Sequence, residues 1–194
     1  YDMAAGRFLP GAPIVAGTGG EVAELWGRAR PDLAMDGVLA EMERLASETL
    51  AAEGPVPAVP DLGALMDELG AMGYALGIAT HDSEGATREQ LARLGVDARF
   101  DFVAGWDSGH GLKPGPGMVE AFSRAVEVSP ARLAMIGDSL HDMGAASAAG
   151  VGLAVAVLTG PAGMEDLSPH ADLVLSSIGA LPDCGALDPP KQRG

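Results

Sequence analysis

The sequence predicts an α/β protein with a Rossmann-like, doubly wound parallel sheet that follows a helical N-terminal segment. Three observations predict this class. Short apolar runs alternate with helical patterns from residue 61 onward, which is the order of strand–helix–strand units with right-handed crossovers. A proline-rich stretch, 54–60, precedes them, and the residues before it have helical periodicity. We therefore expect a helical segment over 1–59, an α/β core over 60–182 and a polar C-terminal tail over 183–194.

The N-terminal segment is predicted to contain two amphipathic helices, a short one over 21–30 and a longer one over 33–53. Pro31 and Asp32 provide a favourable start for the second helix. Apolar side chains then recur at helical spacing, at Leu39, Met42, Leu45 and Leu50. The Glu and Arg residues between them are expected to face solvent.

The core is predicted from apolar runs and helical patterns that glycine or proline separates. The expected helices cover 61–72, 83–94, 116–126 and 141–149. The expected strands cover 74–80, 100–105, 133–137, 151–158 and 172–175. Gly73, Gly95 and Gly150 follow three of the helices, as glycine often does at a helix C-terminus. The carboxyl ends of such parallel strands form the edge at which open α/β sheets bind ligands.

The composition excludes several classes of protein. Hydrophobic residues make up 47% of the 194 residues and charged residues 20%, so the chain can bury a core and is not disordered. The formal net charge of −15 argues against nucleic acid or an anionic membrane surface as a partner, because both attract basic patches. An anionic substrate remains compatible with this charge, since a bound metal ion can reverse the local field.

The single cysteine, Cys184, cannot form a disulfide within the chain, which favours a reducing, cytoplasmic location. The uncharged run over 143–164 contains Pro161 and several glycines, so it is not expected to cross a membrane. The first residues lack the basic and apolar pattern of a signal peptide.

Two carboxylates stand where the predicted strand 133–137 gives way to a helix. Asp138 and Asp142 lie four residues apart in the stretch Gly-Asp-Ser-Leu-His-Asp. Hard oxygen ligands of this kind suit Mg²⁺. Taken alone, however, the pair is better explained as ordinary helix capping, because Asp is a frequent N-cap residue.

The end of another predicted strand and a restricted loop carry polar residues that change this assessment. Thr80 ends the strand 74–80 and precedes His81, so a hydroxyl and the amides of a turn could hold a phosphate oxygen there. Lys113 precedes Pro114-Gly115-Pro116, whose restricted backbone would hold its ammonium group in one place. Each has an ordinary explanation by itself, a strand-end threonine and a solvated lysine. Together with the acidic pair, they favour a phosphate site.

In this order the motifs resemble those of the haloacid dehalogenase superfamily of phosphatases. The resemblance rests on the run 76–80 that ends in Thr80, on Lys113-Pro114, and on the Gly-Asp-x-x-x-Asp motif over 137–142. The surroundings at 100–103 and 148–151 are similar to the phosphoglycolate phosphatase branch. The resemblance covers 60–182, whereas 1–59 is similar to the cap of that branch only in being helical.

The resemblance implies a Mg²⁺-dependent hydrolase of a small phosphorylated metabolite, with 2-phosphoglycolate as the expected substrate and an aspartyl-phosphate intermediate. It implies that Thr80, Lys113 and Asp142 are catalytic, and that His81 joins Thr80 and Lys113 in binding phosphate. Asp138 and Asp142 are the expected metal-side residues, Asp142 acting through the waters of the metal or through hydrogen bonds to the lysine. Two alternatives stay open: another hydrolase of the superfamily, including a dehalogenase, or an inactive module that binds metal, phosphate or a partner.

The first motif of the superfamily, an apolar strand ending in Asp-x-Asp-Gly-Thr, is absent from this sequence. The most similar string, over 33–38, has Ala34 at the position of the nucleophile and lies in a predicted helix. We therefore expect the nucleophile and the central strand that bears it to be missing from these 194 residues. The neighbouring strands would then be left unpaired in the middle of the sheet, where exposed edges favour association into homo-oligomers.

Overall fold

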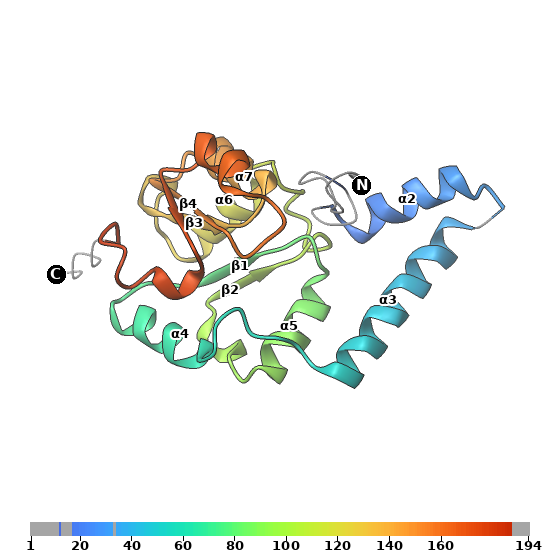
Figure 1. The fold of residues 1–194 in the computed structure, drawn as a ribbon, viewed down its shortest axis with the longest axis horizontal. Helices are drawn as coiled ribbons and strands as arrows, with labels where there is room; N and C mark the ends of the chain where they lie inside the picture. The colour runs from blue at the N-terminus through green and yellow to red at the C-terminus, as the bar shows by residue number, and fades with distance from the viewer. Residues whose placement is uncertain (1–11, 13–16, 33, 188–194) are drawn as a thin grey trace.

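A computed structural model of the chain describes residues 12, 17–32 and 34–187. Helices lie on both sides of parallel strands (Figure 1). Helices α6 (Gly117–Ala125) and α7 (Leu140–Ala149) cover one side, and α4 (Leu62–Ala71) and α5 (Glu84–Arg93) cover the other. This arrangement confirms the predicted α/β class.

The described strands are all parallel to their partners, but they form two separate sheets. Strand β1 (Gly77–Ala79) pairs with β2 (Phe102–Ala104). Strand β3 (Ala134–Gly137) pairs with β4 (Leu153–Val157), which in turn pairs with β5 (Leu173–Leu175). Among these five strands, β1 and β3 have no ladder between them, so each sheet has an unpaired edge.

A cavity of about 670 Å³ borders both unpaired edges. Leu76, just before β1, lines it on one side, and Leu133 and Ile136 line it on the other. Phe122 of α6 and Leu69 of α4 add to its apolar wall. The split sheet and this cavity agree with the expectation that two neighbouring strands stay unpaired in the middle of the sheet.

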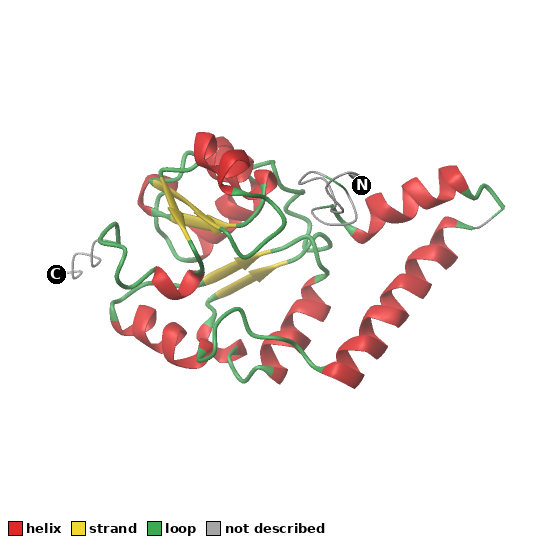
Figure 2. Cartoon of the chain, viewed as in Figure 1, coloured by secondary structure: helices red, strands yellow, loops and turns green. Residues whose placement is uncertain are grey.

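Helices α2 (Gly19–Ala29) and α3 (Met35–Glu53) form a hairpin that extends away from the strands (Figure 2). The side chain of Thr18 accepts the backbone N–H of Glu21, and the carboxylate of Glu21 accepts the backbone N–H of Thr18, which gives α2 a capping box. Val22 and Ala23 of α2 are buried. Leu45, in contrast, is 49% exposed, although its spacing predicted an inward position. The assignment of 1–59 as a separate segment stays a prediction.

The core element boundaries differ from the predicted ones mainly at strand ends. The predicted strand 74–80 is reduced to three paired residues in β1, because its partner β2 is equally short. Gly150 ends α7 in the left-handed conformation at φ 66° and ψ 44°, as its position predicted. The pattern did not predict α8 (Met164–Leu167) or the 3₁₀ turns η1 (Asp97–Arg99), η2 (Pro130–Arg132), η3 (Ser168–His170) and η4 (Ile178–Ala180).

One cluster of buried side chains lies between α7 and the β3–β4–β5 sheet. Ala145 and Ala146 are almost fully buried, which lets the helix approach β3 and β4 closely. Met143 and Leu167 fill the space beyond them at 1% and 0% exposure. This packing fixes the N-terminus of α7 at the carboxyl end of β3. No helix in the described part of the chain is long and apolar enough to cross a membrane.

Candidate functional site

A polar pocket of about 210 Å³ opens at the carboxyl ends of β1 and β3. Segments far apart in the sequence contribute to it: the turn after β1, the loop before α6, the first turn of α7 and the loop after β4. The lining residues are Gly17, Thr80, His81, Asp82, Lys113, Asp138, Ser139, Asp142 and Pro161. The structure thus brings together all five residues that the sequence singled out, while their chemical roles stay predictions.

Lys113 and Asp142 form the ion pair at the centre of this pocket. The Lys113 ammonium donates to Asp142 Oδ1 at 2.6 Å and to the carbonyl oxygen of Ala79 at 2.9 Å. Their side chains are only 10% and 7% exposed. The lysine therefore ties the loop before α6 to the end of β1 and to the start of α7, and its charge is held in one place as the Pro-Gly-Pro sequence predicted.

Asp142 also closes the first turn of α7. Its Oδ2 accepts hydrogen bonds from the Ser139 hydroxyl at 2.7 Å, the Ser139 N–H at 3.1 Å and the Asp138 N–H at 3.2 Å. The Ser139 hydroxyl accepts the Asp142 N–H in return. Both carboxylate oxygens are thus engaged by protein donors. Of the two roles expected for Asp142, this arrangement favours the hydrogen bond to the lysine.

Asp138 is the half-buried carboxylate of the pocket. Burial raises its pKa, and the neighbouring charge of Asp142 raises it further. The side chain lies so close to the loop after β4 that a Cβ on Gly160 would come within 2.2 Å of Asp138 Oδ2. A carboxylate destabilised in this way gains most from a bound cation, which is the property expected of a metal ligand.

The donor set at the pocket fits Mg²⁺. Its carboxylates, Asp82, Asp138 and Asp142, are hard oxygen ligands. Within the described ranges, no three His, Cys, Asp or Glu side chains gather into a complete ligand set. Mg²⁺ commonly completes its octahedron with water and substrate oxygens and needs only one or two carboxylates. The role of Asp138 as its ligand stays a prediction.

The turn after β1 presents Thr80 and His81 to the pocket. The Thr80 N–H donates to Ala104 O, so it continues the β1–β2 ladder, and its hydroxyl accepts the Asp82 N–H at 3.1 Å. This bond fixes the turn as an ST-turn. His110, which also lies beside a motif, contacts Phe102 and does not line the pocket.

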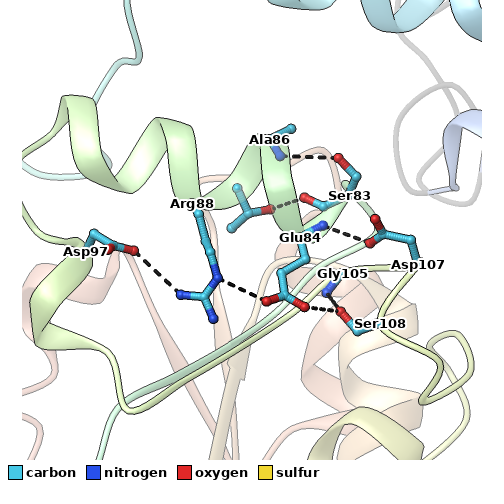
Figure 3. A network of polar contacts seen from close by, with 9 residues as sticks. Ser83, Glu84, Ala86, Arg88, Asp97, Gly105, Asp107 and Ser108 are labelled. Carbon is cyan, nitrogen blue, oxygen red and sulfur yellow. Dashed lines mark hydrogen bonds and ion pairs between the residues drawn. The ribbon is translucent and has the colours of Figure 1, made fainter.

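A second network fastens the loop after β2 to the first turn of α5 (Figure 3). Asp107 Oδ1 accepts the Glu84 N–H at 2.8 Å, and the Ser108 hydroxyl donates to Glu84 Oε2 at 2.7 Å. The same hydroxyl accepts the Gly105 N–H. Hydrogen bonding from Ser108, followed by that from Arg88, lowers the pKa of Glu84. The network holds the loop that leads to Lys113 against the turn that bears Thr80.

Sequence reasoning missed several residues of this site. Ser139 had a local signal, because a Ser three residues before an acidic residue is the signature of a capping box. The Glu84–Ser108 contact had none, since its partners lie 24 residues apart and meet only in the fold. Gly17 and Pro161 also reach the pocket from distant segments without a local signal.

Comparison with known proteins places this chain in a family. The family model described as haloacid dehalogenase-like hydrolase matches residues 18–156. A phosphoglycolate phosphatase of Rhodospirillum rubrum is 35% identical over 96 residues, which are 50% of this chain and 40% of that protein. One of Neisseria gonorrhoeae is 33% identical over 128 residues, 64% of this chain and 52% of that protein. The chain thus spans about half the length of the curated relatives it matches.

Solved structures support the same fold. The crystal structure of a predicted phosphoglycolate phosphatase from Haemophilus somnus 129PT superposes with a TM-score of 0.72 at 19% identity. The match covers 84% of this chain and 74% of that one. At this level of identity the likeness concerns the fold alone.

Proposed function

The chain belongs to the haloacid dehalogenase-like hydrolases, and we propose that it forms the phosphate- and metal-binding part of a Mg²⁺-dependent phosphatase. The observation that carries this proposal is the pocket in which Lys113, Thr80 and Asp138 converge at the carboxyl ends of β1 and β3. The proposed substrate is a small phosphomonoester, and 2-phosphoglycolate is the best candidate. The partial matches to phosphoglycolate phosphatases at 33% and 35% identity support this choice.

Each side chain has a proposed task. Lys113 and the hydroxyl of Thr80 bind phosphate oxygens, with His81 beside them on the same turn. Asp138 ligates Mg²⁺, which when bound neutralises charge on the phosphoryl group as it is transferred. Asp142 acts on Lys113, because the 2.6 Å ion pair holds the ammonium in the position from which it meets phosphate. The network of Glu84 and Ser108 steadies the loop that leads to this lysine.

We place the nucleophile outside the residues that the structure describes. Among the three carboxylates of the pocket, Asp142 is fully engaged, Asp138 is the metal ligand, and Asp82 is an exposed residue of the turn. The proposed nucleophile is an Asp at the end of a further parallel strand. The unpaired edges of β1 and β3, and the apolar cavity beside them, support a position for this strand between the two sheets.

Two assays test the function and separate its parts. For residues 1–194, calorimetry should detect phosphate binding that requires Mg²⁺ and is lost in Asp138→Asn, whereas Asp183→Asn, an exposed carboxylate far along the chain, should leave it unchanged. Absence of Mg²⁺-dependent binding, or its survival in Asp138→Asn, would overturn the site. Steady-state hydrolysis of 2-phosphoglycolate should be undetectable for residues 1–194.

The same hydrolysis should appear in the chain extended by the coding sequence upstream of residue 1. Turnover by residues 1–194 alone would refute the placement of the nucleophile. If the extended chain cleaved other phosphomonoesters tenfold faster than 2-phosphoglycolate, the substrate would be reassigned. If it cleaved none, the alternative of an inactive binding module would replace the phosphatase.

A further inference from the structure

We infer that His81 and His141 form a binding site for one borderline divalent metal ion, such as Zn²⁺ or Ni²⁺, beside the proposed phosphate pocket. His81 lies on the turn after β1, and His141 is the second residue of α7. The fold brings them together across 60 positions of sequence, so that their ring centroids lie 5.5 Å apart with the planes tilted by 59°. This site needs neither the proposed nucleophile nor Mg²⁺.

The spacing of the two rings is that of two imidazoles on one ion. With metal–nitrogen distances of about 2.1 Å and tetrahedral angles, the centroids of two ligating imidazoles stand about 5 Å apart. The observed 5.5 Å is close to this value. The two rings are therefore close enough for one ion to contact both.

His141 also has a ring nitrogen suited to a ligand. Its Nδ1 is buried and makes no hydrogen bond to any residue that the structure describes. Buried polar atoms rarely lack a hydrogen-bond partner or a ligand, so a partner is expected for this nitrogen. A metal ion bound between the rings would supply it.

The two imidazole side chains determine which class of metal ion this site would bind. Neutral imidazole suits Zn²⁺, Ni²⁺ and Cu²⁺, whereas Mg²⁺ demands oxygen ligands. The described residues do not offer a third side chain that completes a ligand set. The ion would therefore keep open positions for water or for an oxygen of a ligand in the pocket that His81 lines. The carboxylate of Asp138, which lines the same pocket as His81, makes the surroundings more favourable to a cation.

Calorimetric titration of residues 1–194 with NiCl₂ and with ZnCl₂, in buffer without Mg²⁺ or phosphate, tests the inference. We expect one equivalent of each ion to bind, and His81→Ala and His141→Ala each to weaken binding at least tenfold. His110→Ala is the matched control, because this histidine lies on a neighbouring loop outside the pocket, and it should bind as the parent chain does. Wild-type affinity in both His81→Ala and His141→Ala would overturn the inference, as would a loss in His110→Ala of the same size.

A second measurement does not depend on the variants remaining folded. Paramagnetic Ni²⁺, added in less than one equivalent to the unsubstituted chain, should broaden the ring proton signals of His81 and His141 before those of His110 and His170. Equal broadening of all four histidines, or none, would contradict the site. Both outcomes are independent of phosphatase activity, so failure of the proposed function would leave this test intact.

Discussion

Replacement of Lys113 by Met tests the central ion pair of the pocket. The substitution keeps the apolar stem but removes the ammonium from a pair whose side chains are 10% and 7% exposed. Breaking a buried pair by removing one partner costs about 3–5 kcal/mol, because the other charge stays buried. Asp142 would keep the three donors on Oδ2 and lose only the one on Oδ1. We therefore expect the lower end of this range, about 3 kcal/mol.

Thermal and urea unfolding would measure this loss. In a chain of this size about 1 kcal/mol corresponds to roughly 2–4 °C, so Tm should fall by about 6–12 °C. Arg28→Met is the matched control, since it removes a cation from an ion pair with Glu24 whose side chains are 71% and 60% exposed. It should change the free energy of unfolding by less than about 0.5 kcal/mol.

A double-mutant cycle then isolates the pair itself. Asp142→Asn alone should also destabilise the protein, and the double variant should lose less than the sum of the two single losses. A coupling energy between about 1 and 3 kcal/mol would agree with a buried, hydrogen-bonded pair. A coupling below about 0.5 kcal/mol would refute the reasoning, because Lys113 would then stabilise the protein through other contacts.

Three further predictions concern the carboxylate, the loop and the open edges. Asp138→Asn should raise the free energy of unfolding at pH 7 without metal, because burial raises the pKa of this carboxyl in the folded state. That gain in stability is present above the pKa of Asp138 in the folded state and should vanish as the pH falls below the ordinary pKa of 3.8, because the carboxyl is then neutral in both states. Urea unfolding that showed an equal gain at pH 7 and at pH 3 would contradict this. Gly105→Ala should lower the free energy of unfolding by more than about 2 kcal/mol, since a Cβ would stand 2.2 Å from the Glu84 nitrogen. Gly85→Ala, where a Cβ would meet nothing within 4 Å, should raise the free energy of unfolding by about 0.5–1 kcal/mol. Similar unfolding midpoints for these two glycine variants would show that the close approach does not matter. Light scattering should show that residues 1–194 associate as concentration rises, because the edges of β1 and β3 are unpaired; a monomer at every concentration, with one cooperative melt, would disprove this.

Much of the core could be predicted because its signals are local. Gly150 ends α7 in the left-handed conformation that its position predicted. The apolar run that precedes α7 forms β3, also as predicted. The strands were predicted too long, since their paired length depends on neighbours that the sequence does not display. The exposed position of Leu45 was also unpredictable, because helical spacing shows which side chains share a face and not whether another element covers it.

The residues of the site also divide into those that the sequence could predict and those that it could not. Thr80 and Asp138 could be chosen because they stand at the ends of predicted strands, which meet at one edge of a parallel sheet. Lys113 could be chosen because the Pro-Gly-Pro sequence after it restricts its loop. The partners of these residues could not be chosen in this way. The Glu84–Ser108 bond joins loops 24 residues apart, and the histidine pair joins a turn to a helix 60 residues later.

The sequence by itself determined most of the helices and strands of the core, where several helices end, and which loops bear charge, since capping, periodicity and glycine conformation act within a few residues. Only the tertiary structure decided that an apolar cavity lies beside the unpaired edges of β1 and β3. It also decided that Asp142 gives one oxygen to Lys113 and the other to the turn of α7. The physical reason is that strand pairing and buried ion pairs depend on which distant segments meet, and packing in three dimensions selects those partners.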